Sequence, residues 1–298
     1  MTGSSGLVGS ELVPALAADG HRVVRLLRGR SDAPDVLSWD PMEGRIDAAG
    51  LEGIDAVVHL AGAGIGDKKW TPDRKREIRE SRVRGTTLLS ETLASLTKTP
   101  AVLVSAAAVG FYGPRADEVL TEESSRGEGW LAEVVEDWEA ATSAAEKAGI
   151  RVVRVRSGPI LSAEGGILKR MLFPFKAGVG GRIGTGRQYM SWITLGDEVG
   201  AIRHVLTGED LSGPVNLTAP NPVTNTEFTK TLGGIVHRPT AIPTPVRFLK
   251  IPYGAELVFN LLLSGQRVVP RRLVESGYRF QHEHLESALR ELLGKSAD

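Results

Sequence analysis

The stretch Thr2-Gly3-Ser4-Ser5-Gly6-Leu7-Val8-Gly9 decides the fold of this chain, because its glycines recur every three residues at the start of a helix. Glycine allows a tight turn and a close approach of the backbone to a ligand, and a helix N-terminus offers unpaired N–H groups and the positive end of the helix dipole. These properties suit a pyrophosphate group. The stretch therefore predicts the phosphate-binding loop of a dinucleotide site, although glycine triplets also occur in ordinary turns.

The residues around this loop support the prediction. Leu12, Val13 and Leu16 have helical spacing, and the helix is expected to end at Asp19-Gly20 before the β-rich run 21–27. A dinucleotide-binding unit also has a strand before its loop, whereas Met1 stands directly before this one. Because that strand lies at the centre of the sheet, we expect the natural chain to begin further upstream than Met1.

The end of the strand 21–27 indicates which dinucleotide is bound. Enzymes that bind NAD usually place an acidic residue there, on the ribose hydroxyls, but this chain has Arg28-Gly29-Arg30. Guanidinium groups suit a 2′-phosphate, because their planar fork forms paired hydrogen bonds to its oxygens. The sequence therefore predicts NADP(H) rather than NAD(H); the alternative is a solvated charged loop.

Short apolar runs alternate with amphipathic helices along much of the chain. This pattern is typical of a doubly wound parallel α/β sheet, whose strands are covered on both faces. After a loop that contains Pro34 and Pro41, the pattern predicts strands at 56–60, 101–105, 151–156 and 215–218, and helices at 72–96 and 131–148. Glycines crowd residues 165–186, and prolines punctuate the chain beyond Pro220.

The change of rhythm after Gly158 predicts two interleaved parts. We expect an NADP-binding Rossmann domain formed by residues 1–160 plus 186–219. A smaller substrate-side cap, or C-terminal domain, is expected from residues 161–185 plus 220–298.

Composition narrows the class of protein. Lys and Arg total 36 and balance 36 Asp and Glu, which gives no global attraction to nucleic acid or to an anionic membrane. The chain has no cysteine, so it has no disulfides and no cysteine-bearing metal site. Its longest apolar stretch, 255–263, is shorter than the ~20 residues of a membrane span. We expect a cytoplasmic protein with a small-molecule substrate, no nucleic-acid or membrane partner, and an oligomeric state that the sequence leaves open.

A metal site is not expected. His282-Glu283-His284 contains two possible ligands, but alternate residues at the start of a helix lie on different faces, and no third ligand follows at a diagnostic spacing. We therefore interpret this segment as a solvated surface.

Several short motifs together resemble those of the extended short-chain dehydrogenase/reductases, the NAD-dependent epimerase/dehydratase superfamily. More narrowly, the chain resembles the atypical "epimerase family protein" subgroup, which carries a C-terminal domain of unknown function. The similarity runs nearly end to end. Its landmarks are Thr2 to Gly9, Leu60-Ala61-Gly62, Glu80-Ser81-Arg82, Gly110-Phe111-Tyr112-Gly113, Trp138-Glu139, Arg156-Ser157-Gly158, Gly184-Thr185-Gly186-Arg187-Gln188, Ser191-Trp192-Ile193, Asp197 and Ser264-Gly265-Gln266-Arg267.

The resemblance implies further cofactor contacts. Leu60, Ala61 and Gly62 are expected near the adenosine side, and Ile160 near the nicotinamide end. Arg82 stands where ordinary extended members have an asparagine, so it is expected to point at the cofactor, with Glu77 nearby. The alternative is a solvated helix face. The full predicted set is Gly3, Ser4, Gly6, Leu7, Val8, Arg28, Arg30, Leu60, Ala61, Gly62, Glu77, Arg82 and Ile160.

The usual catalytic groups of the family are missing. Its chemistry uses a Tyr-x-x-x-Lys helix, but alignment on Glu139 puts Leu131 and Val135 at those positions, and the helper serine falls near Ala107 or Ala108. Possible substitutes are Tyr112, Ser105 and Glu133, although phenols and hydroxyls in cores are more often only hydrogen-bonded.

The substrate side is also atypical. Met190 stands at the position of a phosphate-binding arginine of nucleotide-sugar epimerases, so Arg182, Arg187 and Gln188 are weak substrate candidates. Two functions remain open: an NADP(H)-dependent oxidoreductase or epimerase with an unusual proton donor, and a non-catalytic NADP(H)-binding or redox-sensing module. A structural protein without a cofactor is a third possibility, which would leave the glycine loop without a purpose.

Overall fold

A parallel sheet flanked by helices forms the body of the protein in the computed structural model, which describes residues 1–29 and 33–295. β4, β5, β7 and β11 pair in this order, all parallel, and β1 pairs in parallel with β2. The bounds are β1 Arg25–Leu27, β2 Val36–Asp40, β4 Ala56–His59, β5 Val102–Ala108, β7 Arg151–Ser157 and β11 Gly213–Leu217. This is the predicted doubly wound Rossmann architecture.

Thr2 joins the two groups of strands. It forms parallel bridges with Leu26 on one side and His59 on the other. The backbone N–H of Thr2 donates to the carbonyl oxygen of Val58 at 3.0 Å, and the N–H of Leu26 donates to that of Met1 at 2.7 Å. Met1 and Thr2 therefore occupy the central position in which an earlier strand was expected.

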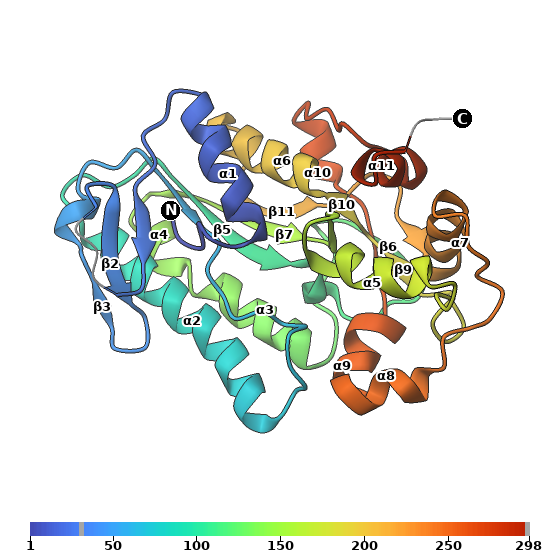
Figure 1. The fold of residues 1–298 in the computed structure, drawn as a ribbon. Helices are drawn as coiled ribbons and strands as arrows, with labels where there is room; N and C mark the ends of the chain where they lie inside the picture. Colours follow the sequence, from blue (N-terminus) through green and yellow to red (C-terminus); the bar gives the residue numbers. More distant parts are fainter. Residues whose placement is uncertain (30–32, 296–298) are drawn as a thin grey trace.

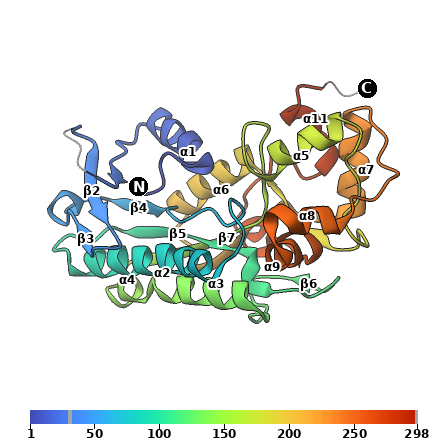
Figure 2. The same cartoon turned by 60° about the horizontal axis from the view of Figure 1, so that its bottom comes forward.

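Two layers of helices cover the sheet (Figures 1 and 2). One face carries α1 (Leu7–Ala18) and α6 (Leu195–Thr207). The other face carries α2 (Pro72–Ser95), α3 (Trp130–Ala140) and α4 (Ser143–Lys147). Because successive strand residues point to opposite faces, each strand must be apolar on both sides. The apolar runs of β4 and β5 satisfy this need, whereas β7 carries Arg154 and Arg156 on one face, where Thr142 and Glu139 bind them.

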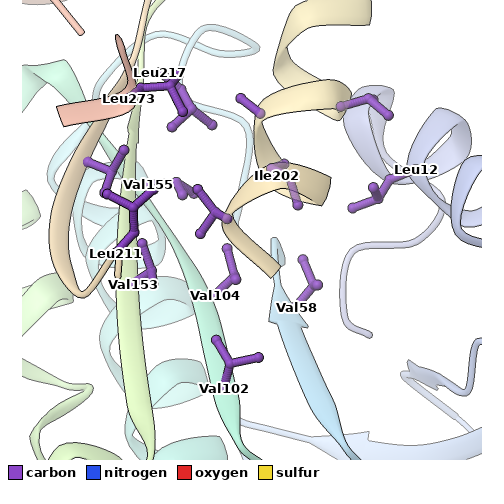
Figure 3. Close-up of a cluster of buried hydrophobic side chains, with 14 of the residues drawn as sticks. Leu12, Val58, Val102, Val104, Val153, Val155, Ile202, Leu211, Leu217 and Leu273 are labelled. Carbon is purple, nitrogen blue, oxygen red and sulfur yellow. The ribbon is translucent and has the colours of Figure 1, made fainter. Parts of the chain in front are cut away.

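The side of the sheet under α1 and α6 holds the largest apolar cluster. Val58, Val104 and Val155 point from three neighbouring strands toward Ile202 of α6 and Leu12 of α1 (Figure 3). The valine side chains are almost fully excluded from solvent. This packing fixes the carboxyl ends of the strands, and the start of α1, against one another.

Two local predictions were wrong. Residues 131–148 were expected to form one helix, but the helix is interrupted between α3 and α4, where the Thr142 hydroxyl donates to the carbonyl oxygen of Glu139 at 2.7 Å and accepts from Arg154 at 3.1 Å. The loop expected around Pro34 and Pro41 contains the strand β2, which forms a hairpin with β3 (Arg45–Ile46).

Most of the segments after β7, apart from α6 and β11, form the smaller part of the molecule beyond the carboxyl ends of the strands (Figure 2). Short strands pair β8 with β10, β9 with β12 and β6 with β13. The strand bounds are β6 Val119–Leu120, β8 Ile160–Leu161, β9 Tyr189–Met190, β10 Ile193–Thr194, β12 Val223–Thr224 and β13 Arg267–Val268. The helices are α5 Gly166–Lys176, α7 Asn225–Ile235, α8 Val246–Tyr253, α9 Ala255–Val258, α10 Arg271–Glu275 and α11 Leu285–Leu292, with short turns η1 Ala49–Leu51, η2 Val109–Tyr112 and η3 Phe259–Leu263.

The buried Asp197 ties this part to the sheet. Its carboxylate accepts hydrogen bonds from the backbone N–H groups of Gln281 at 2.7 Å and His282 at 3.1 Å. His282 is only 9% exposed, and its ring Nε2 lies 3.3 Å from Glu291. The expectation of a solvated surface was therefore wrong for His282, because the N-terminal turn of α6 holds its backbone inside the protein. None of the helices within residues 1–29 and 33–295 combines the length and the apolar character of a membrane span.

Candidate functional site

The glycine loop lies at the carboxyl edge of the sheet, between β1 and β4. Gly3 has φ +68°, a left-handed conformation that favours glycine. A Cβ atom on Gly3 would lie 2.8 Å from the carbonyl carbon of Leu60, and one on Gly9 would lie 2.2 Å from the carbonyl oxygen of Gly3. Larger residues would therefore push the loop away from both the neighbouring strand and α1. Gly6 is exposed at the start of α1, and no side chain in the described part of the protein caps that helix end.

A buried chain of hydrogen bonds holds the loop to α2. The Thr2 hydroxyl accepts from the N–H groups of Leu60 and Ala61 at 3.1 and 3.2 Å, so its own proton is free to donate to Nδ1 of His59, 2.8 Å away. The His59 Nε2 then donates to Thr86 Oγ1 at 3.0 Å. This arrangement requires a neutral imidazole. Burial, with a smaller contribution from the Met1 amino group, lowers the pKa of His59 to about 4.

His59 should make stability fall as the pH is lowered. The ordinary pKa of histidine is 6.5, so between pH 6.5 and about pH 4 His59 binds a proton in the unfolded chain but not in the folded chain. The free energy of unfolding is therefore at its full value above pH 6.5 and is lower by about 3 kcal/mol near pH 4, at 1.36 kcal/mol per pKa unit. Urea denaturation of the wild type and of His59→Gln, compared at several pH values, measures this. The difference in unfolding free energy between the two proteins should change across this range, and a constant difference would contradict the assignment.

Two arginines of α2 hold the loop that follows β4. Arg82 donates to the carbonyl oxygens of Ala63 at 2.9 Å and Ile78 at 3.1 Å, and lies against the ring of Trp138. A Cβ atom on Gly62 would lie 3.5 Å from Arg82. Among the described residues Arg82 has no carboxylate partner, and burial lowers its pKa to about 10. Arg82 is therefore a cation in contact with the predicted adenosine-side loop, not a solvated helix residue.

Glu77 is exposed, and its carboxylate is paired with Arg74. Arg74 is buried, donates to the carbonyl oxygen of Gly64 and to Glu77 at 2.6 Å, and holds the pKa of Glu77 below its usual range. Arg74 was not among the sequence candidates. The available signal was its position two steps of four residues before Arg82 on one helix, because residues four apart lie on the same side of a helix.

The opposite end of the site is formed by the segment after β7. A Cβ atom on Gly165 would lie 2.7 Å from the Leu7 side chain, and one on Gly166 would lie 3.1 Å from the carbonyl oxygen of Ile160. Ile160 also packs on the same apolar cluster as Val8 and Leu60. The structure thus places Val8, Leu60 and Ile160 against one apolar cluster.

Arg28 lies beside a cavity that was not predicted from the sequence. The side chain is exposed and makes no hydrogen bond or ion pair within the described residues. The next residue, Gly29, lines a cavity of about 370 Å³ together with Ser38, Trp39, Asp40 and Arg45. Ser38, Trp39 and Asp40 belong to β2 and Arg45 begins β3, in a segment that was predicted to be a loop. Arg30 lies outside the described residues.

The buried Tyr112 has both hydrogen-bonding capacities of its hydroxyl in use. It is 0% exposed; its hydroxyl donates to Asn216 Oδ1 at 2.7 Å and accepts from Arg156 at 2.9 Å. Arg156 in turn forms two hydrogen bonds, at 2.7 and 2.8 Å, with the carboxylate of Glu139. Burial raises the pKa of Tyr112. This network gives Tyr112 a structural role between η2, β7 and β11.

The other proton-transfer candidates lie apart from one another. Ser105 is 1% exposed in the middle of β5, and its hydroxyl has no partner among the described residues. Glu133 is exposed on the first turn of α3. Leu131 packs in an apolar cluster with Trp70 and Leu257, and Val135 is buried near Gly110. The positions of the family's tyrosine and lysine thus serve apolar packing here.

The substrate candidates belong to the glycine-rich segment before β9. The Gln188 side chain donates to the carbonyl oxygens of Ile183 at 3.0 Å and Leu262 at 2.8 Å, which ties two loops together. Arg182 donates to the carbonyl oxygen of Gly184 at 2.7 Å. The guanidinium of Arg187 is exposed and makes no bond within the described residues, so it is the one of the three that is free to meet a ligand.

The residues at this edge fit a dinucleotide. Gly3 and Gly9 let the loop lie against the backbone of Leu60 and against α1, where Cβ atoms would collide. The uncapped start of α1 offers N–H groups to an anion, and Arg28 adds a cation without a partner among the described residues. Larger side chains at Gly3 or Gly9 would displace the loop from this position.

Comparisons with known proteins agree with this geometry. Residues 1–217 match the NAD-dependent epimerase/dehydratase family, and residues 244–292 match a domain of unknown function, DUF1731. The chain is similar to the epimerase family protein Mb2239 of Mycobacterium bovis, with 44% identity over 97% of this chain and 95% of that protein. It is also similar to YfhF of Bacillus subtilis, with 36% identity over 98% and 97% of the two chains.

A solved structure resembles the whole chain. The crystal structure of human epimerase family protein SDR39U1 (isoform 2) with NADPH superposes with a TM-score of 0.89, at 33% identity, over 98% of both chains. The agreement extends across the sheet and the smaller C-terminal part.

Proposed function

Because the chain belongs to the NAD-dependent epimerase/dehydratase family, we propose that it binds NADP(H) at the carboxyl edge of its sheet and acts as an oxidoreductase or epimerase on a small-molecule substrate. The observation that carries this proposal is the glycine loop, where Gly3 and Gly9 lie too close to neighbouring backbone for any side chain and so hold the loop against Leu60 and the start of α1. The NADPH in the human SDR39U1 structure supports the choice of cofactor.

Each part of the site has a proposed task. The glycine loop and the first N–H groups of α1 would hold the diphosphate, and Arg28 beside the cavity at Gly29 would bind the 2′-phosphate. Arg82 would keep the loop at Gly62 in place against the adenosine. Ile160 would pack beside the nicotinamide, which supplies hydride transfer when the cofactor is bound.

The preference for NADP(H) should depend on Arg28. We expect Arg28→Ala to weaken NADPH binding about 10- to 100-fold, the value of one or two charge-assisted hydrogen bonds, and to leave NADH binding nearly unchanged. The dissociation constants of both cofactors, measured by fluorescence titration, test this.

A matched control is Arg22→Ala. Arg22 lies before β1 rather than after it, and is also exposed, where it pairs with Asp35. This variant should keep the wild-type preference. Equal loss of NADPH and NADH affinity in Arg28→Ala would contradict the 2′-phosphate assignment.

A second function is favoured by the packing around Leu131. With Leu131 and Val135 in apolar surroundings and the Tyr112 hydroxyl in use, a protein that binds NADP(H) without turnover, and senses its redox state, is the alternative. Thermal shift with NADPH tests binding, because a ligand that binds only the native state raises its stability. Hydride turnover with panels of small carbonyl compounds and sugar nucleotides separates the enzyme from the sensor.

A further inference from the structure

The carboxyl group of Glu198 is buried with an unusually small set of partners. Glu198 lies on the first turn of α6, is 2% exposed, and has no hydrogen-bond partner for its Oε2 among the described residues. Its Oε1 accepts one hydrogen bond, from the Ser157 hydroxyl at 2.5 Å. A buried carboxylate with one neutral partner is costly, so its charge should depend strongly on what lies nearby.

Ser157 connects this carboxyl group to the edge of the cofactor site. It is the last residue of β7 and is partly exposed, whereas Glu198 lies behind it. Three residues further on, Ile160 packs with Val8 and Leu60 on the cluster that also includes Leu195, one helical turn before Glu198. Ser157 thus lies at the carboxyl end of β7, three residues before the position proposed to contact the nicotinamide, and Glu198 is hydrogen-bonded to it.

No cation of the described chain compensates Glu198. On its own helix, Asp197 is bonded to the backbone N–H groups of Gln281 and His282, Arg203 pairs with Asp19, and His204 with Ser276. Tyr278 donates to Asp197, and its pKa is raised by burial, by Asp197 and by the charge of Glu198. The charged side chains of the elements packed on α6 point elsewhere: Glu11 of α1 is exposed, Arg151 donates to carbonyl oxygens near Val205 and Leu211, and Arg154 and Arg156 bind Thr142 and Glu139 on the opposite face of the sheet. β5, β8 and β10 carry no titratable side chain.

We propose that Glu198 and Ser157 form a proton-binding pair whose protonation depends on the charge of the bound cofactor. The protein binds NADP⁺ with Glu198 ionised and NADPH with Glu198 protonated. The nicotinamide ring is positive in NADP⁺ and neutral in NADPH, so an uncompensated carboxylate nearby favours the oxidised form. The inference rests on the proposed cofactor site. It involves no electron transfer, because each form binds separately and the proton exchanges with solvent through Ser157.

The pKa of Glu198 lies close to neutral pH. Burial raises the pKa of Glu198 to about 8, opposed by the hydrogen bond from Ser157. Near neutral pH a nearby charge therefore changes its protonation, and by linkage its protonation changes the affinity for that charge.

The test compares the two cofactor forms across pH. Dissociation constants for NADP⁺ and NADPH are measured from about pH 6 to about pH 10, on either side of the Glu198 pKa. The ratio of the two constants should change on the order of tenfold in favour of NADP⁺ as the pH rises, equivalent to one pKa unit. Titration of the 2′-phosphate affects both constants equally, because both forms carry this group, so it does not change their ratio.

Variants assign the effect to the pair. Glu198→Gln, which imitates the protonated acid, should give a ratio independent of pH, and Glu11→Gln on the neighbouring helix should keep the wild-type profile. Ser157→Ala removes the hydrogen bond that favours the charged form, so it should move the transition to higher pH. Calorimetric titration in two buffers of different ionisation enthalpy should show different proton uptake for the two forms in the wild type, and the same uptake for both forms in Glu198→Gln.

The outcomes separate this inference from the proposed function. A wild-type ratio that does not change with pH, while both forms bind, overturns the role of Glu198 and leaves the cofactor site standing. An unmoved transition in Ser157→Ala overturns the role of Ser157. Absence of binding by either form at any pH overturns the proposed function itself, and the inference with it.

Discussion

Gly6→Val is expected to lose NADPH binding by at least about 100-fold, or about 2.7 kcal/mol. Gly6 is exposed at the start of α1, and a Cβ atom there would lie 3.3 Å from the carbonyl oxygen of Gly3, so the loop must already shift slightly. The two methyl groups of valine would then occupy the space in front of the uncapped N–H groups. Because φ of Gly6 is −78°, the backbone itself tolerates the substitution and the fold should persist.

The matched control for this variant is Gly234→Val. Gly234 lies on α7 and is exposed, and a Cβ atom added to it would meet nothing within 4 Å among the described residues. It should retain wild-type affinity in the same fluorescence titration, with both variants showing wild-type circular dichroism. Wild-type affinity of a folded Gly6→Val would remove the loop from the cofactor site.

Breaking the ion pair between Arg156 and Glu139 should strongly destabilise the protein. Arg156 is 3% exposed, forms two hydrogen bonds with Glu139, and donates a third to the Tyr112 hydroxyl. Glu139→Ala would leave a buried guanidinium without its counter-ion, which lowers the free energy of unfolding by about 3 to 5 kcal/mol. Urea denaturation at neutral pH measures the loss.

An apolar double variant distinguishes the destabilisation caused by an unpaired charge from that caused by a lost contact. Arg156→Met combined with Glu139→Leu leaves no unpaired charge, so it should recover much of the stability that either single substitution loses. The exposed pair of Arg271 and Glu275 is the control, and Glu275→Gln should leave the denaturation midpoint unchanged. Additive losses in the double variant would show that the two side chains do not act as a pair.

The sequence predicted those parts of the site that depend on short-range pattern. The glycine spacing located the loop at Gly3, and the apolar run at 56–60 located β4, because a strand buried on both faces needs such a run whatever surrounds it. The strand β2 was missed because prolines at 34 and 41 flank it, and its pairing with β1 decides its conformation. The cavity at Trp39 was therefore missed as well.

Roles that depend on contacts between distant residues could not be predicted. The Tyr112 hydroxyl is bound by Asn216, 104 positions away, and nothing in the local sequence around Tyr112 indicates this partner. The interruption after α3 depends in the same way on Arg154, since no glycine or proline marks residues 141–142. Two residues whose polar side chains suggested the surface, Arg74 and His282, are buried in the structure.

The hydrogen bonds from the Gln281 and His282 amides to Asp197 have a consequence for how the chain can be divided. They join a helix of the Rossmann part to a segment more than eighty positions later, and β6 and β13 add a second such connection. Cutting the polypeptide between these elements would leave buried acceptors and amides unsatisfied in both fragments. We therefore expect neither fragment to fold on its own, and expect the C-terminal segment to act as a built-in component of the nucleotide-binding scaffold rather than as a detachable module.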